Sequence, residues 1–186
     1  MNYDVSSIEK MEGIEPIRKN PGMFVGDIRN PTRILEEVLD NALDEVQAGQ
    51  CTKIFVEINN EEGYFKIIDN GRGFPFDQSR DINEDPPILS SISLFTSGKF
   101  KKGKDDAYQI STGLHGVGMS CVYALSNKMY ISSCRDKLQG DYILYRDGTI
   151  KRTQTPYEGN RKYSTSITVY PSEQDFKTTQ IDKSTI

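Results

Sequence analysis

Two acidic residues and one asparagine share a stripe of a predicted helix over residues 31–49, PTRILEEVLDNALDEVQAG. Glu37, Asn41 and Asp44 recur at spacings of three and four residues, and Glu45 lies at the margin of the same stripe. A carboxylate can deprotonate an attacking water, and a neutral amide oxygen is a ligand that Mg²⁺ accepts. The stripe therefore offers a general base and a metal ligand side by side. A solvated acidic flank is the commoner origin of such a stripe.

A second candidate residue, Asp69, follows a predicted strand over residues 64–68. It opens the segment Asp69-Asn70-Gly71-Arg72-Gly73, whose glycines allow a backbone to approach a ligand closely. A carboxylate at this position accepts a hydrogen bond from the exocyclic amine of adenine and repels the oxygen that guanine carries there. The pattern therefore indicates an adenine site, and a simple Asp-Asn-Gly turn is the alternative.

A glycine-rich segment, G-x-x-G-x-G at residues 113–118, leads directly into a helical run over 117–125. Backbone N–H groups at the start of a helix attract phosphate oxygens, so this segment is a candidate phosphate loop. It matches neither the Walker pattern nor the dinucleotide-binding fingerprint, which begins after a first strand. Lys99 could meet phosphate charge or be solvated, and His115 could donate to phosphate or pack the loop.

The helix over residues 31–49 must position the first stripe. Asn30 is a candidate cap, Pro31 suits the first helical position and Gly49 suits the stop. Its predicted buried face consists of Ile34, Leu35, Val38, Leu39, Ala42, Leu43 and Val46.

The remaining segments predict an α+β two-layer sandwich, with helices over one face of a mostly antiparallel mixed sheet. A short helical segment runs toward Arg18 and breaks at Pro21-Gly22. A short helix is expected around residues 88–95, and two or three helices are expected to cover the sheet. The predicted strands are residues 52–59, 64–68, 129–133, 142–152 with an Asp147-Gly148 turn inside, and 166–170. The long irregular connection over residues 74–112 is typical of a functional lid.

The composition fits one globular domain of 186 residues with 27% charged residues. A net charge of -4 makes the chain alone a poor non-specific ligand for DNA. Three cysteines without CxxC spacing favour a reducing cytoplasm over a disulfide framework or a zinc site. We see no signal peptide and no membrane anchor, and therefore expect no membrane partner.

Together, these segments resemble the ATPase domain of type II DNA topoisomerases, the gyrase B and topoisomerase IV type. That domain belongs to a superfamily with MutL, sensor histidine kinases and large heat-shock chaperones. The resemblance covers nearly the whole chain, in the order RKNPGMFVG from Arg18, then EVLDNALDE, DNGRGFP, TSGKF, GLHGVG and SITVYPS.

The resemblance implies a role for each matching residue. Glu37 corresponds to the water-activating base, Asn41 to the Mg²⁺ ligand and Asp69 to the acceptor of the adenine amine. The other residues implied at the ATP site are Glu45, Arg72, Gly73, Pro75, Lys99, Tyr108, Gly113, Leu114, His115, Gly116, Val117, Gly118, Arg152 and Thr165. Among these, Arg152 corresponds to an arginine at the pocket mouth, and Thr165 to a hydroxyl beside Asp69.

The same resemblance divides the chain into parts. Residues 1–186 form the ATP-binding subdomain, with an N-terminal arm over 1–13 and an ATP lid over about 74–118. Ser111-Thr112-Gly113 replaces the usual run of glycines before the phosphate loop, and the segment 152–164 is shorter than in common bacterial enzymes. The transducer and DNA-cleavage domains are absent from this chain, so we expect slow hydrolysis and a monomer in solution.

The expected function is ATP binding and hydrolysis that drives a dimer gate for DNA strand passage. A MutL-like repair clamp and a non-hydrolysing ATP sensor are the alternatives, and Glu37 disfavours the sensor. The resemblance implies that the full-length protein binds DNA, pairs with a subunit or domain carrying a cleavage tyrosine, and forms a homodimer with ATP. It also implies inhibition by aminocoumarin compounds and a cytoplasmic location, near the nucleoid or in a phage host.

Overall fold

Six strands form one continuous sheet in the computed structural model, which describes residues 12–74, 86–92, 117–159 and 164–185. Across the sheet the strands follow the order β1-β2-β6-β3-β4-β5, and every pair is antiparallel. Their bounds are β1 Ile54–Asn59, β2 Tyr64–Asp69, β3 Ser126–Arg135, β4 Leu138–Tyr145, β5 Ile150–Pro156 and β6 Thr165–Pro171.

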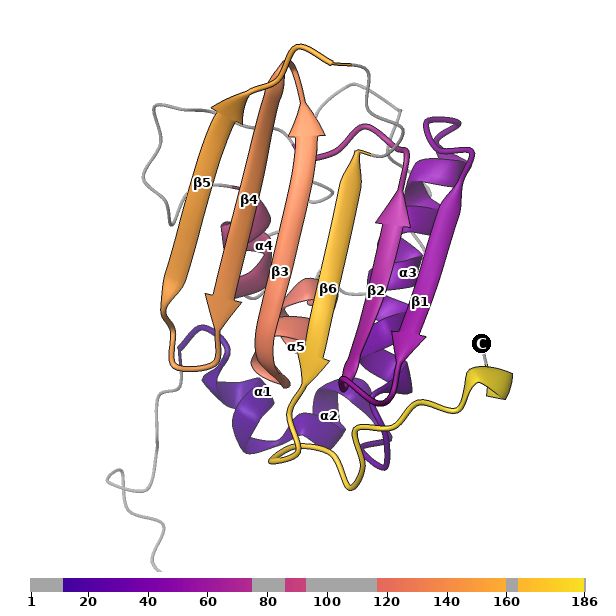
Figure 1. Cartoon of the computed structure of the whole chain (residues 1–186). Coiled ribbons are helices and arrows are strands. Elements are labelled where there is room, and N and C mark those ends of the chain that lie inside the picture. The colour runs from indigo at the N-terminus through magenta and orange to yellow at the C-terminus, as the bar shows by residue number, and fades with distance from the viewer. Residues whose placement is uncertain (1–11, 75–85, 93–116, 160–163, 186) are drawn as a thin grey trace, which may run out of the picture.

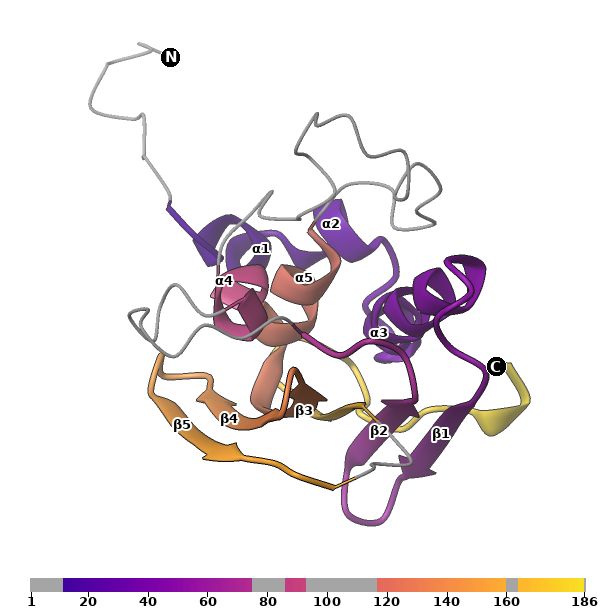
Figure 2. The ribbon, with the colours of Figure 1, turned by 90° about the horizontal axis from the view of Figure 1, so that it is seen from above.

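The helices lie on one face of this sheet, which makes two layers (Figures 1 and 2). They are α1 Glu15–Lys19, α2 Pro21–Val25, α3 Thr32–Gln47, α4 Pro86–Ile92 and α5 Gly118–Ala124, with a short 3-10 turn, η5 Lys183–Thr185. The predicted α+β two-layer sandwich is confirmed. The expected helix number was too low, because Pro21 ends α1 and also opens a second short helix, where its fixed φ suits the first turn.

The core lies between the two layers. Buried and half-buried residues alternate along β2, so that Phe65, Ile67 and Asp69 all face the helices. Against them α3 packs the fully or almost fully buried side chains of Ile34, Leu35, Val38 and Ala42.

The predicted buried face of α3 is wrong at its C-terminal half. Leu43 and Val46 are 37% and 42% exposed. At about 100° per residue, Leu43 lies roughly 130° from the centre of the arc made by Ile34, Leu35, Val38 and Ala42. The apolar stripe in the sequence is therefore wider than the face that the sheet covers.

The ends of α3 follow the predicted signals with one shift. The helix begins at Thr32, one residue later than predicted, and the Asn30 side-chain oxygen accepts the Thr32 N–H at 3.0 Å. Gly49 follows the last turn with φ +70°, a conformation that glycine adopts without strain. Pro31 therefore takes the N-cap position predicted for Asn30, which bonds the first helical residue from one position earlier, and Gly49 follows the C-cap residue Ala48.

The predicted strand over 142–152 is two strands, β4 and β5, with the predicted turn at Asp147-Gly148 between them. A further hairpin joins β3 to β4 through Asp136 and Lys137, whose φ values are +52° and +63°. Our strand prediction missed this hairpin because neither residue is the glycine that usually marks such a turn.

Two arginines hold the C-terminal end of α5. Arg18 Nε and Arg146 Nη1 both donate to the Ala124 carbonyl at 3.2 Å. Arg146 also forms an ion pair at 2.5 Å with Asp175, whose side chain is 6% exposed. These contacts tie α5, and so the start of the helix at Gly118, to segments at both ends of the chain.

Candidate functional site

Asp69 is the last residue of β2 and is 7% exposed. Its Oδ1 accepts the Gly71 N–H at 2.8 Å, and the Thr165 hydroxyl donates to the same carboxylate. Asp69 and Thr165 face each other in the β2–β6 register, which explains the contact. Burial nevertheless raises the pKa of Asp69 above its ordinary value, because desolvation outweighs the two hydrogen bonds.

The segment after Asp69 is held by α3. The Glu45 carboxylate accepts the Arg72 backbone N–H at 3.0 Å and the Arg72 guanidinium at 2.8 Å and 3.0 Å. These bonds to Arg72 lower the pKa of Glu45 and keep it ionised. Gly71 is required here, since an added Cβ would lie 2.9 Å from Asp69 Oδ1 and 3.0 Å from Glu45. Asp69, Glu45 and Arg72 thus form one connected cluster.

Glu37 lies two helical turns before Glu45 on α3. Its Oε1 pairs with Arg33 Nη2 at 2.8 Å, and its side chain is 19% exposed. A Cβ added at Gly118, the first residue of α5, would overlap the Glu37 carboxylate. The predicted general base, Glu37, therefore lies directly against the end of the predicted phosphate loop.

Asn41 lies between Glu37 and Glu45 and is exposed. Its Nδ2 donates to the Glu37 carbonyl at 2.8 Å, which leaves Oδ1 as the atom that can face a cation. Among the residues that the structure describes, no group of three or more His, Cys, Asp or Glu side chains could hold a metal ion. A single amide oxygen fits Mg²⁺, which usually keeps several waters and takes few protein ligands.

The spacing along α3 sets the length of the site. At about 1.5 Å per residue, Glu37 and Glu45 are roughly 12 Å apart along the helix axis. This distance is comparable with the span from base to terminal phosphate in a nucleoside triphosphate. Asp69, predicted to bind the adenine, lies at the Glu45 end of this span, and Glu37, predicted to activate the water, lies at the other end.

The structure adds two residues from β3 that our sequence reasoning missed. Ser133 Oγ accepts the Phe74 N–H at 2.9 Å, and Arg135 Nη1 donates to the Gly73 carbonyl at 3.3 Å. Both contacts join positions about 60 residues apart, which local patterns do not reveal. Arg135 is thus the β3 arginine at the edge of the Asp69 cluster.

Arg152 lies on β5, the edge strand farthest from β1 (Figure 1). It pairs with Tyr142 of β4, and three strands separate β5 from Asp69 on β2. At about 4.8 Å per strand, the structure does not bring Arg152 to the Asp69 cluster. The pocket-mouth role of Arg152 stays a prediction that this topology does not favour.

Several predicted site residues lie outside the described part of the chain: Pro75, Lys99, Tyr108, Gly113, Leu114, His115 and Gly116. Most of the predicted lid and almost all of the predicted arm lie outside it too. Val117 and Gly118 are described, and both are half-buried at the start of α5.

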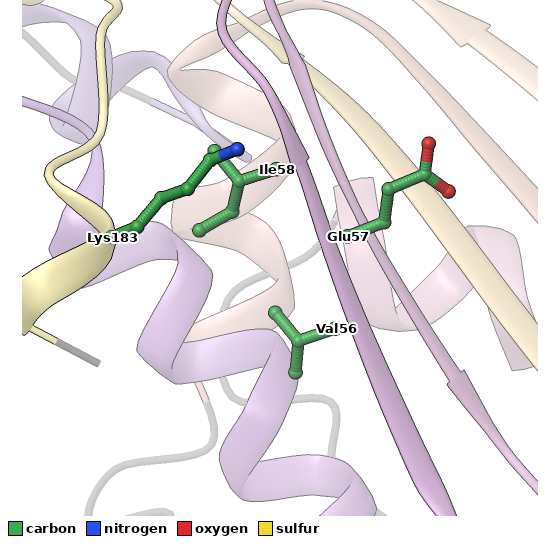
Figure 3. A pocket seen from close by; sticks show the side chains of 4 residues that line it. All are labelled: Val56, Glu57, Ile58 and Lys183. Atoms are coloured by element: carbon green, nitrogen blue, oxygen red, sulfur yellow. The ribbon is translucent and has the colours of Figure 1, made fainter.

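A hollow elsewhere on the surface is separate from this cluster. It lies beside β1 and is lined by Val56, Glu57, Ile58 and Lys183 (Figure 3). None of the predicted site residues lines it, so we do not assign it to nucleotide binding. In the described part of the chain, no helix has the length and apolar character needed to cross a bilayer.

Comparison with solved structures identifies a similar fold. The chain matches the ATP-binding domain of topoisomerase IV from Francisella tularensis, solved with a small-molecule inhibitor, with a TM-score of 0.74 and 26% identity. The match covers 96% of this chain and 82% of that one.

Sequence comparison gives two informative relatives. The DNA gyrase B protein of Chlamydia pneumoniae is 37% identical over 98% of this chain and 23% of its own length. The DNA topoisomerase 4 B protein of Mycoplasma capricolum is 35% identical over 99% of this chain and 28% of its own length. The chain thus spans about a quarter of these curated relatives. Residues 26–174 match the model of the histidine kinase-, DNA gyrase B-, and HSP90-like ATPases, and the chain belongs to this family.

Proposed function

We propose that this chain is the ATP-binding subdomain of a type II DNA topoisomerase. The observation that carries the proposal is the buried Asp69 carboxylate at one end of α3 and the Glu37 carboxylate against Gly118 at the other. The names of the relatives favour a topoisomerase over a MutL-like clamp or a non-hydrolysing sensor. In the proposal, the chain is one subdomain of a longer polypeptide.

Each residue of the cluster has one task in this proposal. Asp69 accepts the adenine amine, and Thr165 and the Gly71 amide orient its carboxylate. Glu45 holds Arg72 at the side of the base. Glu37, oriented by Arg33, accepts a proton from the attacking water.

Asn41 is the residue of this chain that would hold Mg²⁺ with the nucleotide. The ion, when bound, neutralises phosphate charge during transfer. Lys99 and the segment 113–118 remain our proposal for the other phosphate contacts. We also keep Pro75 and Tyr108 as proposed contacts at the adenine end.

For the longer protein, we propose that ATP binding closes a dimer gate and hydrolysis reopens it during DNA strand passage. Its partners would be a second identical copy and the subunit or domain that carries the cleavage tyrosine. We propose a cytoplasmic location and inhibition by aminocoumarin compounds, which would compete at the Asp69 end.

The direct test is calorimetric titration of the chain with ATP and GTP in Mg²⁺. ATP should bind, and GTP should bind at least ~10-fold more weakly, because its base places an oxygen where adenine has an amine. Equal binding of both, or none, would contradict the assignment of Asp69. Supercoil relaxation by the longer protein tests the topoisomerase assignment separately.

A further inference from the structure

Three side-chain oxygens bind three backbone amides in the segment 71–74. Asp69 Oδ1 accepts the Gly71 N–H at 2.8 Å, and Glu45 Oε2 accepts the Arg72 N–H at 3.0 Å. Ser133 Oγ accepts the Phe74 N–H at 2.9 Å. The three acceptors come from β2, α3 and β3, so separate elements fix the two ends of this short segment.

Gly73 lies between the parts held by Glu45 and by Ser133. Its φ is +72°, and an added Cβ would lie 2.7 Å from the Cys134 carbonyl oxygen and 2.9 Å from Ser133 Oγ. The backbone of the segment therefore packs directly on the backbone of β3. Gly73 has no side chain to restrict rotation about its own backbone bonds, so contacts of its neighbours must fix the backbone here. The hydrogen bond from the Phe74 N–H to Ser133 Oγ therefore holds the far end of the segment in place.

Ser133 also lies close to Asp69, the residue proposed to bind the adenine. It is fully buried, and it pairs with Thr165, which in turn pairs with Asp69. Asp69, Thr165 and Ser133 thus form one row across three neighbouring strands. A buried amide that loses its acceptor costs more than the bond itself contributes, so the Phe74 end would move away if the hydroxyl were removed.

We propose that Ser133 is a positioning residue for base binding, because its hydroxyl fixes the Phe74 end of the segment that surrounds the adenine. This inference rests on the proposed function and adds to it a residue from β3. At the catalytic end, Glu37 is held by Arg33 and Asn41 by the Glu37 carbonyl, so these contacts belong to α3 itself. Removal of the Ser133 hydroxyl therefore weakens nucleotide binding and leaves the chemical step nearly unchanged.

The test compares Ser133→Ala with Ser133→Thr and with Ser132→Ala. Ser132 is the adjacent residue on β3 and is half-buried on the opposite face, so it is a matched control. Titration of each chain with ATP and with ADP should give dissociation constants raised about 5- to 20-fold for Ser133→Ala, equally for both nucleotides. Ser133→Thr keeps the hydroxyl and should restore most of the affinity, and Ser132→Ala should bind normally.

In the longer protein, Ser133→Ala should raise KM by the same factor and change kcat by less than about twofold. A merely structural role would not produce this separation. Thermal unfolding checks that each variant is folded, and Ser133→Cys, whose thiol is a weak acceptor, replaces Ser133→Ala if the latter does not fold.

The outcomes separate the two proposals. If the unmodified chain does not bind ATP, the proposed function and this inference both fail. If the unmodified chain binds ATP and the folded Ser133→Ala chain binds it equally well, only the role of Ser133 fails. A fall in kcat with unchanged KM would also overturn the positioning role.

Discussion

Replacing Asp69 by asparagine separates nucleotide recognition from folding. The substitution keeps the size of the side chain and an oxygen that can accept the Gly71 N–H. It removes the negative charge that, in the proposed function, accepts the adenine amine. Because a hydrogen bond to a charged group contributes about 1.5–3 kcal/mol, the dissociation constant for ATP should rise roughly 10- to 150-fold.

The same substitution should not destabilise the chain at neutral pH. Burial raises the pKa of Asp69 in the folded state, so the ionised carboxylate costs folding free energy. Below the ordinary pKa, Asp69 is protonated in both states and carries no such cost. As pH rises from that value through the raised folded pKa, the unfolded chain loses its proton first and stability falls. Asparagine does not titrate, so Asp69→Asn should gain stability relative to the unmodified chain across this window.

Two assays on one pair of proteins test this reasoning. Calorimetric titration with ATP and GTP measures recognition. Asp69→Asn should reduce the preference for ATP over GTP, because the asparagine amide can donate a hydrogen bond to the guanine oxygen. Urea unfolding at several pH values measures stability, and other carboxylates cancel in the difference between the two chains. Unchanged ATP affinity, or a stability difference that moves the opposite way with pH, would refute the assigned role or the pKa direction.

Three further substitutions test other parts of the structure. Glu37→Gln in the longer protein should spare ATP binding and lower turnover by about 10²–10⁴-fold; normal turnover would remove it as the base. Gly118→Ala should displace the Glu37 carboxylate and lower turnover by roughly 10²-fold, measured by phosphate release, and a fully active variant would contradict their contact. Asp175→Asn should lower the free energy of unfolding by about 3 kcal/mol in urea, because Arg146 loses its ion pair; a change near zero would show that the pair is not formed.

The relative positions of candidate site residues that lie close together along the chain could be predicted from the sequence. Glu37, Asn41 and Glu45 share one helix, and their periodicity fixes their common face before any tertiary contact is known. Asp69 and the glycines after it are likewise adjacent in sequence. The confirmed sandwich follows from the same kind of information, since alternating and helical patterns are local.

Contacts between distant segments could not be predicted in this way. Arg152 was assigned by its distance from a glycine, yet the Asp147-Gly148 turn places Arg152 on a separate strand, β5, at the far edge of the sheet. The pairing of β3 with β6 brings β3 close to the Asp69 cluster, so that Ser133 and Arg135 contact the segment after Asp69. Strand order, which depends on long-range pairing, decided which arginine lies at the cluster.

The two layers of the sandwich contact different parts of the candidate site, so substitutions in each layer should have different effects. Glu37 and Glu45 belong to one helix, so a tilt of α3 would move the proposed catalytic end and the proposed adenine end together. Ser133 binds the segment after Asp69 and approaches it from the sheet. Changes at β3 should therefore alter affinity alone, and changes in the packing of α3 should alter affinity and turnover together. Paired measurements of KM and kcat thus show which layer of the sandwich a substitution disturbs.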